Sequence, residues 1–193
     1  MINTKSINSK SINTQSINTQ SINTTPINTK PINTRSAPRR ELSFHCTGCL
    51  KEELARIEDA HRKGTLTHTG NWTAGENLDH VAKAWEFAID GFPSEVKVPW
   101  FIRLIASTMK GRMTSGKTLP AGFKMGKGGE SFLPTPGTTV EAGLGRLRAV
   151  VDRLDAGTKC TKPSPAFGAL THDQWMRLNL GHAQLHLGFV SYP

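Results

Sequence analysis

Residues 171–190, near the C-terminal end, have a pattern that constrains the fold more than any other part of the chain. At about 100° per residue, the polar or small side chains of this segment share one narrow arc of a helix. They are Arg177, Gly181, Gln184 and Gly188. Apolar side chains dominate the remaining circumference, so the side chains on that wide arc are expected to point into the protein.

Two histidines, His182 and His186, lie near the middle of this apolar arc, together with Asn179. Positions i and i+4 stack on one face of a helix, so the two imidazoles can bind one metal ion together. Buried neutral imidazoles need partners for their nitrogen atoms, and a shared metal supplies one. The alternative is a separate hydrogen-bond partner for each ring. The motif differs from that of the zinc proteases, because Ala183 stands in place of the catalytic glutamate.

His80 is the best candidate for a third ligand, since catalytic zinc sites usually take three ligands from the protein. It lies on a helix predicted over residues 74–90, whose start is marked by a capping box of Thr73 and Glu76. His80 falls outside the charged stripe of this helix but close to its edge. We therefore expect it to be less securely buried than the other two histidines.

The other segments also have helical spacing. One helix is predicted over 48–60, and another begins at about Pro99. A further helix follows a capping box of Thr138 and Glu141, and the last helix begins with a capping box of Thr171 and Gln174. The helix after Pro99 carries Phe101, Leu104, Ile105 and Met109. Few segments alternate with period two, so a sheet is not expected. The Gly/Pro-rich stretch after this helix is too long for a simple connection, and we expect it to cover the entrance of the metal site.

Several short motifs together resemble the DinB-like superfamily, in a branch of bacterial domains of unknown function. They are Trp72-Thr73, Leu78-x-His80-Val81, Phe167-Gly168, Leu170-Thr171, Trp175 and His182-x-x-x-His186-Leu187. The resemblance runs from about residue 40 to the end. It implies an all-α, four-helix bundle in which His80, His182 and His186 surround a divalent metal. At one position the chain departs from the pattern, since Phe189 stands where relatives often carry glutamine.

Characterised members of that superfamily include transferases and isomerases that use low-molecular-weight thiols such as bacillithiol or mycothiol. The resemblance thus implies a metal-dependent thiol transferase or a hydrolase acting on a small molecule. Imidazole ligands favour zinc or nickel. Asn179 lies one turn before His182 on the same face of the helix, and we expect it to orient a ligand or substrate without binding the metal itself. No carboxylate is obviously placed as a general base, so a non-catalytic metal- or ligand-binding bundle is the alternative, and whether the protein is an enzyme stays open.

The N-terminal segment differs sharply from the rest of the chain. Over residues 1–35 the dipeptide Ile-Asn recurs every five residues, a period that matches neither helix nor strand. The segment is rich in Asn, Ser, Thr and Lys and cannot offset the entropy of ordering by burial. We predict a disordered repeat tail over residues 1–39 and one helical domain over 40–193. An expanded DNA repeat or an upstream start codon would also explain the repeat.

The charge distribution limits the partners. Six basic residues precede Glu41, the first acidic residue, so the tail supplies six of the net nine positive charges. The domain is left with a net charge of only +3, which argues against specific nucleic-acid binding. No apolar run is long enough for a membrane span, and none resembles a signal peptide. We expect a cytoplasmic protein with a small-molecule substrate and no membrane partner; a homodimer is left open.

Residues 111–118, Gly-Arg-Met-Thr-Ser-Gly-Lys-Thr, match the P-loop pattern letter for letter. A working P-loop joins a strand to a helix. Here the preceding segment has helical spacing, and Pro120 and Gly122 prevent a helix directly afterwards. We therefore interpret the segment as a flexible basic loop.

Cys46 and Cys49 form a single C-x-x-C motif at a predicted helix start. Such a pair can lower a thiol pKa or supply half of a zinc site. A structural zinc site needs a second pair, and only Cys160 remains. We interpret Cys49 as a small core residue and Cys46 as incidental, in a reducing environment.

Overall fold

The computed structural model describes residues 31–122 and 129–193. Its helices are α1 (Thr47–Arg62), α2 (Ala74–Asp90), α3 (Trp100–Met113), α4 (Val140–Asp155) and α5 (His172–Leu187), with a short 3-10 helix η1 (Glu130–Phe132). Two strands of two residues each, β1 (Thr67–His68) and β2 (Val190–Ser191), pair antiparallel. The disorder predicted for the repeat concerns mainly residues 1–30, which lie outside the described residues.

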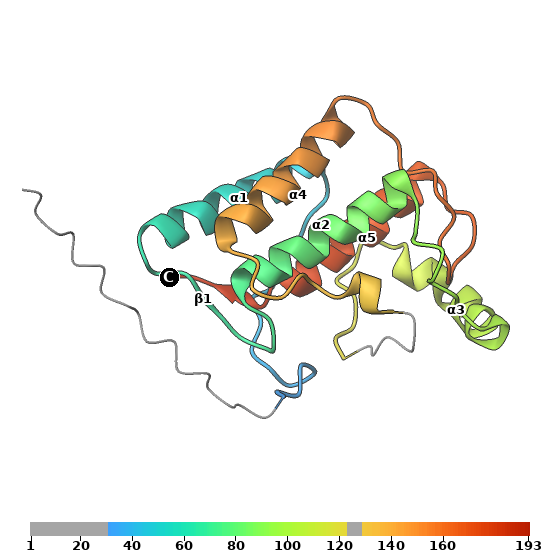
Figure 1. Ribbon diagram of the computed structural model, residues 1–193, viewed down its shortest axis with the longest axis horizontal. Helices are drawn as coiled ribbons and strands as arrows, with labels where there is room; N and C mark the ends of the chain where they lie inside the picture. Colours follow the sequence, from blue (N-terminus) through green and yellow to red (C-terminus); the bar gives the residue numbers. More distant parts are fainter. Residues whose placement is uncertain (1–30, 123–128) are drawn as a thin grey trace, which may run out of the picture. The chain divides into compact units, whose positions relative to one another are not determined.

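Four of the helices pack around one core, which confirms the predicted all-α fold. α2 packs against both α4 and α5, and α1 packs against α4 (Figure 1). Trp85, Leu78 and Val81 of α2 have no solvent exposure, and they share one core with Leu147 of α4 and Leu187 of α5. The helix that carries His80 is therefore central to the bundle.

The helix starts mostly follow the predicted caps. Capping boxes form at Thr73 with Glu76 and at Thr171 with Gln174, as expected. The prediction for α4 was wrong by one residue: its N-cap is Thr139, whose side chain accepts a hydrogen bond from Ala142 N. Thr138 and Thr139 are both residues that can cap a helix. Contacts between the chain before the helix and the rest of the protein therefore determine which of them is the N-cap.

Two glycines allow α2 and α4 to approach closely. A Cβ atom added at Gly143 of α4 would lie 2.7 Å from Gly75 O and 2.7 Å from Leu78 Cβ, both on α2. A Cβ added at Gly75 would lie 2.2 Å from Thr138 O. Because real Cβ atoms do not make such short contacts, the separation of these helices depends on the absence of side chains here.

α3 lies apart from the other helices (Figure 1). Most of its large apolar side chains are exposed. Trp100 is 76% exposed and Leu104 is 62% exposed, and Phe101, Ile105 and Met109 are also exposed. Helical spacing correctly predicted a helix here. Of its apolar residues, only Met113 at its end packs against the core of the described chain.

The segment after α3 lies along α5 and covers the polar arc of that helix. Gln184 Nε2 donates to Gly116 O at 3.0 Å, and Leu119 N donates to Gly181 O at 3.2 Å. A Cβ at Gly181 would come within 2.4 Å of Lys117 O, so glycine permits this contact. The P-loop-like sequence thus begins at the end of a helix instead of a strand, which supports the rejection of a phosphate loop.

Residues 31–39, which we assigned to the tail, contact the helical domain. Ile32 N donates to Asn71 Oδ1 at 2.7 Å, and Ala37 is buried against Leu185 and Phe189. The packed part of the chain thus includes residues before the predicted boundary at residue 40. None of the helices within residues 31–122 and 129–193 combines the length and apolarity that a membrane-spanning helix needs.

The close approach of α2 and α4 can be tested with one methyl group. Gly143→Ala should lower the free energy of unfolding by about 1–3 kcal/mol, because the new Cβ overpacks the helix contact. Gly145→Ala is the matched control on the same helix: nothing lies within 4 Å of its added Cβ, so it should raise stability by about 0.5–1 kcal/mol. Urea unfolding measures both changes. Equal stability of the two variants would contradict the close contact.

Candidate metal centre

Three histidine rings from two helices converge at one place in the bundle. α2 supplies His80, and α5 supplies His182 and His186. One nitrogen of each ring lies within 4.8 Å of one nitrogen of the other two. The ring centroids are 4.4–4.8 Å apart, and each pair of rings is steeply inclined, at 61° to 67°. The structure therefore brings together all three histidines that the sequence singled out.

The spacing of the nitrogens suits a shared metal ion. His80 Nε2 and His182 Nε2 are 3.1 Å apart. Two imidazole nitrogens bound to one tetrahedral zinc at about 2.0–2.1 Å lie about 3.3 Å from each other. The observed separation is close to that value, so the three-histidine cluster is compatible with a metal ion.

A backbone carbonyl determines which nitrogen of His80 carries its proton. His80 Nδ1 lies 2.5 Å from Phe132 O in η1. A carbonyl oxygen can only accept a hydrogen bond, so Nδ1 is the donor and Nε2 of the neutral ring keeps its lone pair. That lone pair faces His182. The long Gly/Pro-rich stretch thus contacts the cluster through η1. That it covers an entrance to the site stays a prediction.

Burial keeps the histidines neutral. His80 is 9% exposed, and burial lowers its pKa to about 4, although the carbonyl of Phe132 acts in the opposite direction. His182 and His186 are half-buried. Burial, and after it the neighbouring histidines, lowers the pKa of each ring well below the usual range. Near pH 7 all three rings are therefore available as neutral nitrogen donors. His80 is the most buried of the three, contrary to our expectation.

Two nitrogens of the cluster lack partners. Nδ1 of His182 and Nδ1 of His186 are buried and make no hydrogen bond to any described part of the chain. The same holds for Nδ2 of Asn179, the residue that we expect to orient a ligand or substrate. Asn179 is 3% exposed. Buried polar atoms without partners destabilise a protein. The described chain alone does not complete this cluster.

Trp72 covers the cluster and was not among the predicted site residues. Its ring is stacked on His186 at a centroid distance of 5.3 Å and an interplanar angle of 20°. It also contacts His80 at 4.7 Å. An aromatic residue directly before the capping box of the His80 helix was the available signal. Trp72 limits the orientations of two of the three rings.

A buried ion pair lies next to His80 in the chain. Asp79 accepts hydrogen bonds from Arg146 Nη1 of α4 at 2.5 Å and from Thr135 N at 2.7 Å. Burial raises the pKa of Asp79, but the bonds from Thr135, Arg146 and Lys83 outweigh this effect and lower it below the usual range. The Asp79 carboxylate is thus already engaged and is not placed as a free base.

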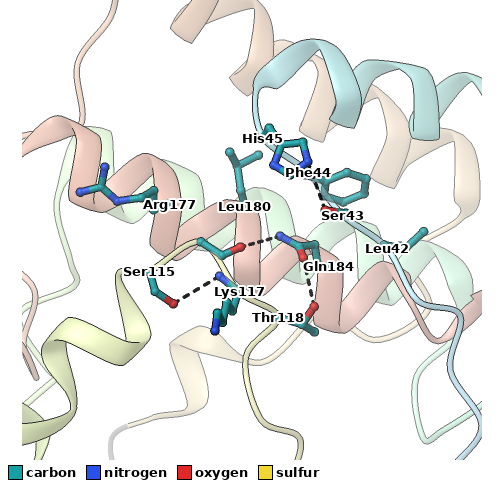
Figure 2. A pocket seen from close by; sticks show the side chains of 11 residues that line it. Leu42, Ser43, Phe44, His45, Ser115, Lys117, Thr118, Arg177, Leu180 and Gln184 are labelled. Carbon is teal, nitrogen blue, oxygen red and sulfur yellow. Dashed lines mark hydrogen bonds between the residues drawn. The ribbon is translucent and has the colours of Figure 1, made fainter.

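A separate pocket of about 520 Å³ lies on another side of α5 (Figure 2). Its lining includes Arg177, Leu180 and Gln184 of α5 and Ser115 to Thr118 of the segment after α3. None of the three clustered histidines lines it. The pocket is therefore separate from the histidine cluster.

Fold and cluster together define a helical-bundle protein with a three-histidine group that could hold a metal ion. The chain matches a family described as "Protein of unknown function (DUF1569)" over residues 36–192. It therefore belongs to the DUF1569 family. No curated protein and no solved structure matches the chain.

The ion pair beside the cluster can be tested through stability. Arg146→Met should lower the free energy of unfolding by roughly 2–4 kcal/mol, because it leaves Asp79 buried without its main cation. Arg148→Met is the matched control on α4, since Arg148 pairs with Glu58 at the surface and should contribute less than about 1 kcal/mol. Chemical unfolding of both variants measures the difference. Similar losses would show that the Asp79 pair has no special role.

The same pair predicts a pH dependence. The pKa of Asp79 is lowered in the folded state, so its contribution to stability is present above its unfolded pKa of about 4. That contribution is lost as the pH falls through the folded pKa. Stability measured from pH 6 to pH 2 should fall less steeply in Asp79→Asn than in the wild type. An unchanged slope would contradict the lowered pKa.

Proposed function

We propose that His80, His182 and His186 bind one divalent metal ion, zinc or nickel, as three neutral nitrogen ligands. The observation that supports this most strongly is the convergence of three ring nitrogens within 4.8 Å of one another in a partly buried site. A further observation agrees with it. The carbonyl of Phe132 holds the proton of His80 on Nδ1, so the lone pair on Nε2 is directed toward Nε2 of His182.

His80, His182 and His186 would hold the ion without neutralising its charge, and this charge would lower the pKa of a water or thiol bound beside it. The chain's own residues orient the ligands. Phe132 O holds the proton of His80 on Nδ1, and Trp72 stacks on His186 and contacts His80. These contacts would keep the rings in place before any ion binds.

For the reaction we propose a thiol transfer or a metal-assisted hydrolysis on a small molecule. This part of the proposal relies on the resemblance to the DinB-like superfamily, whose characterised members include thiol-dependent transferases. Asn179 would orient a ligand or the substrate, since its buried side-chain nitrogen has no partner among the described residues. A low-molecular-weight thiol would then serve as cosubstrate.

One observation favours a second candidate, a non-catalytic metal- or ligand-binding protein. Asp79, the carboxylate that directly precedes His80, is held by Arg146, Lys83 and the Thr135 backbone. A carboxylate in such contacts cannot readily accept a proton from a substrate. Without a free base, the bundle would hold its metal for structure or for ligand binding.

Metal content tests the ligand set. We expect about one equivalent of zinc or nickel per purified wild-type chain, and less than about half an equivalent in His80→Ala, His182→Ala and His186→Ala. His68→Ala is the matched control, because His68 is exposed on β1 and lies outside the cluster. Elemental analysis by mass spectrometry provides the measurement. Low metal content in the wild type, even after addition of zinc or nickel, would contradict the metal site.

Activity separates the two candidates once metal binding is shown. A transferase should conjugate low-molecular-weight thiols to electrophilic substrates, lose activity with a chelator and regain it when metal is restored. Asn179→Ala should then reduce turnover while keeping the metal. Full metal occupancy without chelator-sensitive thiol transfer or hydrolysis across a broad substrate panel would favour the binding protein.

A further inference from the structure

The start of α1 carries two thiols that the proposed metal site does not use. Cys46 is the N-cap residue of α1, and Cys49 lies in the first turn of that helix. Their sulfur atoms are 3.4 Å apart, and both thiols are free. Cys46 is exposed and Cys49 is half-buried. Our interpretation of Cys46 as incidental did not take account of this close pairing.

Helix capping does not explain the cysteine at this position. The N-cap threonines of α2, α4 and α5 each accept a hydrogen bond from the backbone of the first turn. Cys46 makes no such bond. The sulfur of Cys46 lies beside that of Cys49 instead. This pairing of two sulfur atoms is the feature that helix capping does not explain.

We propose that Cys46 and Cys49 form a reversible disulfide when they meet a low-molecular-weight disulfide. The S–S bond is about 2.05 Å long, so the two sulfurs need to approach by only about 1.4 Å, which rotation of the side chains provides. Gly48 adds no side chain between them and the solvent. The exposed sulfur of Cys46 is the one that an external disulfide can reach.

The exchange proceeds in two balanced steps. The thiolate of Cys46 attacks one sulfur of the external disulfide, which forms a mixed disulfide and releases one thiolate. The thiolate of Cys49 then attacks the sulfur of Cys46, closes the internal disulfide and releases the second thiolate. The two protein thiols lose two electrons and two protons, and the external disulfide becomes two thiols.

The surroundings of Cys49 favour its role in the second step. A hydrogen bond from the backbone of His45 lowers the pKa of Cys49, and this bond does not depend on the thiol of Cys46, which the mixed disulfide removes. The N-terminal end of α1 also favours a negative charge. By contrast, Cys160 is fully buried, and burial raises its pKa to about 11. Cys160 therefore serves as an internal control that should not react in the folded protein.

Mass spectrometry of the reduced full-length protein after incubation with oxidised glutathione tests this proposal. We expect the intact mass to fall by two hydrogen atoms, about 2 Da, with Cys46 and Cys49 joined in one peptide and Cys160 still free to be alkylated after denaturation. Added dithiothreitol should reverse the change. Three free thiols, a bond that includes Cys160, or a glutathione adduct that does not proceed to the internal disulfide would each overturn the proposal.

Three variants sharpen the test. Cys49→Ser should stop at a stable glutathione adduct on Cys46, whereas Cys46→Ser should form no internal disulfide and react at least tenfold more slowly. Cys160→Ser should behave as the wild type does. His182→Ala should also form the disulfide, because the pair lies outside the histidine cluster. Loss of the reaction in His182→Ala with its helical circular dichroism retained would overturn the independence of the two sites.

Discussion

The carboxylate of Asp79 joins α2, the helix that carries His80, to α4 and to the stretch that contains η1. It belongs to α2, accepts a bond from Arg146 of α4, and accepts another from the backbone of Thr135 in the stretch that contains η1. The next residue, His80, faces the carbonyl of Phe132 in that same stretch. The position of the His80 ring and the position of its proton thus both depend on one buried charge and its partners.

α5 shows how a mostly apolar helix is oriented in this bundle. Three of the four residues of its narrow polar arc, Gly181, Gln184 and Gly188, are buried, and Arg177 is exposed. Gly181 has no side chain and so leaves room for the backbone of Lys117, and Gly188 lies against the backbone of Arg40. Chain segments cover this side of the helix, and its opposite side turns His182 and His186 toward α2. The glycines of the arc therefore contribute to the histidine cluster indirectly, because they allow the close contacts of α5 with the neighbouring chain segments.

The helical pairing of His182 with His186 and most helix starts were accessible from the sequence, because both rest on local rules. Spacing of four residues places His182 and His186 on one face, and the capping boxes at Thr73 and Thr171 mark two helix starts. Other features depend on contacts between distant residues. The position of Trp72 before a capping box does not show that it stacks on His186, and the carbonyl of Phe132 beside His80 has no local signature. The exposure of α3 was equally inaccessible, since periodicity shows that a helix has apolar residues but not whether another element covers them.

The proposed metal site would favour an anion as a further ligand. Three neutral imidazoles would leave the charge of a divalent ion uncompensated, and burial already disfavours positive charge here, as the lowered pKa values of the three histidines show. The nearest carboxylate in the chain, Asp79, is neutralised by Arg146 and Lys83. In a partly buried site the interaction between a cation and an anion is stronger than in water. A thiolate or a hydroxide would therefore be bound more favourably than the neutral thiol or water, which is the property that a metal-dependent transferase or hydrolase requires.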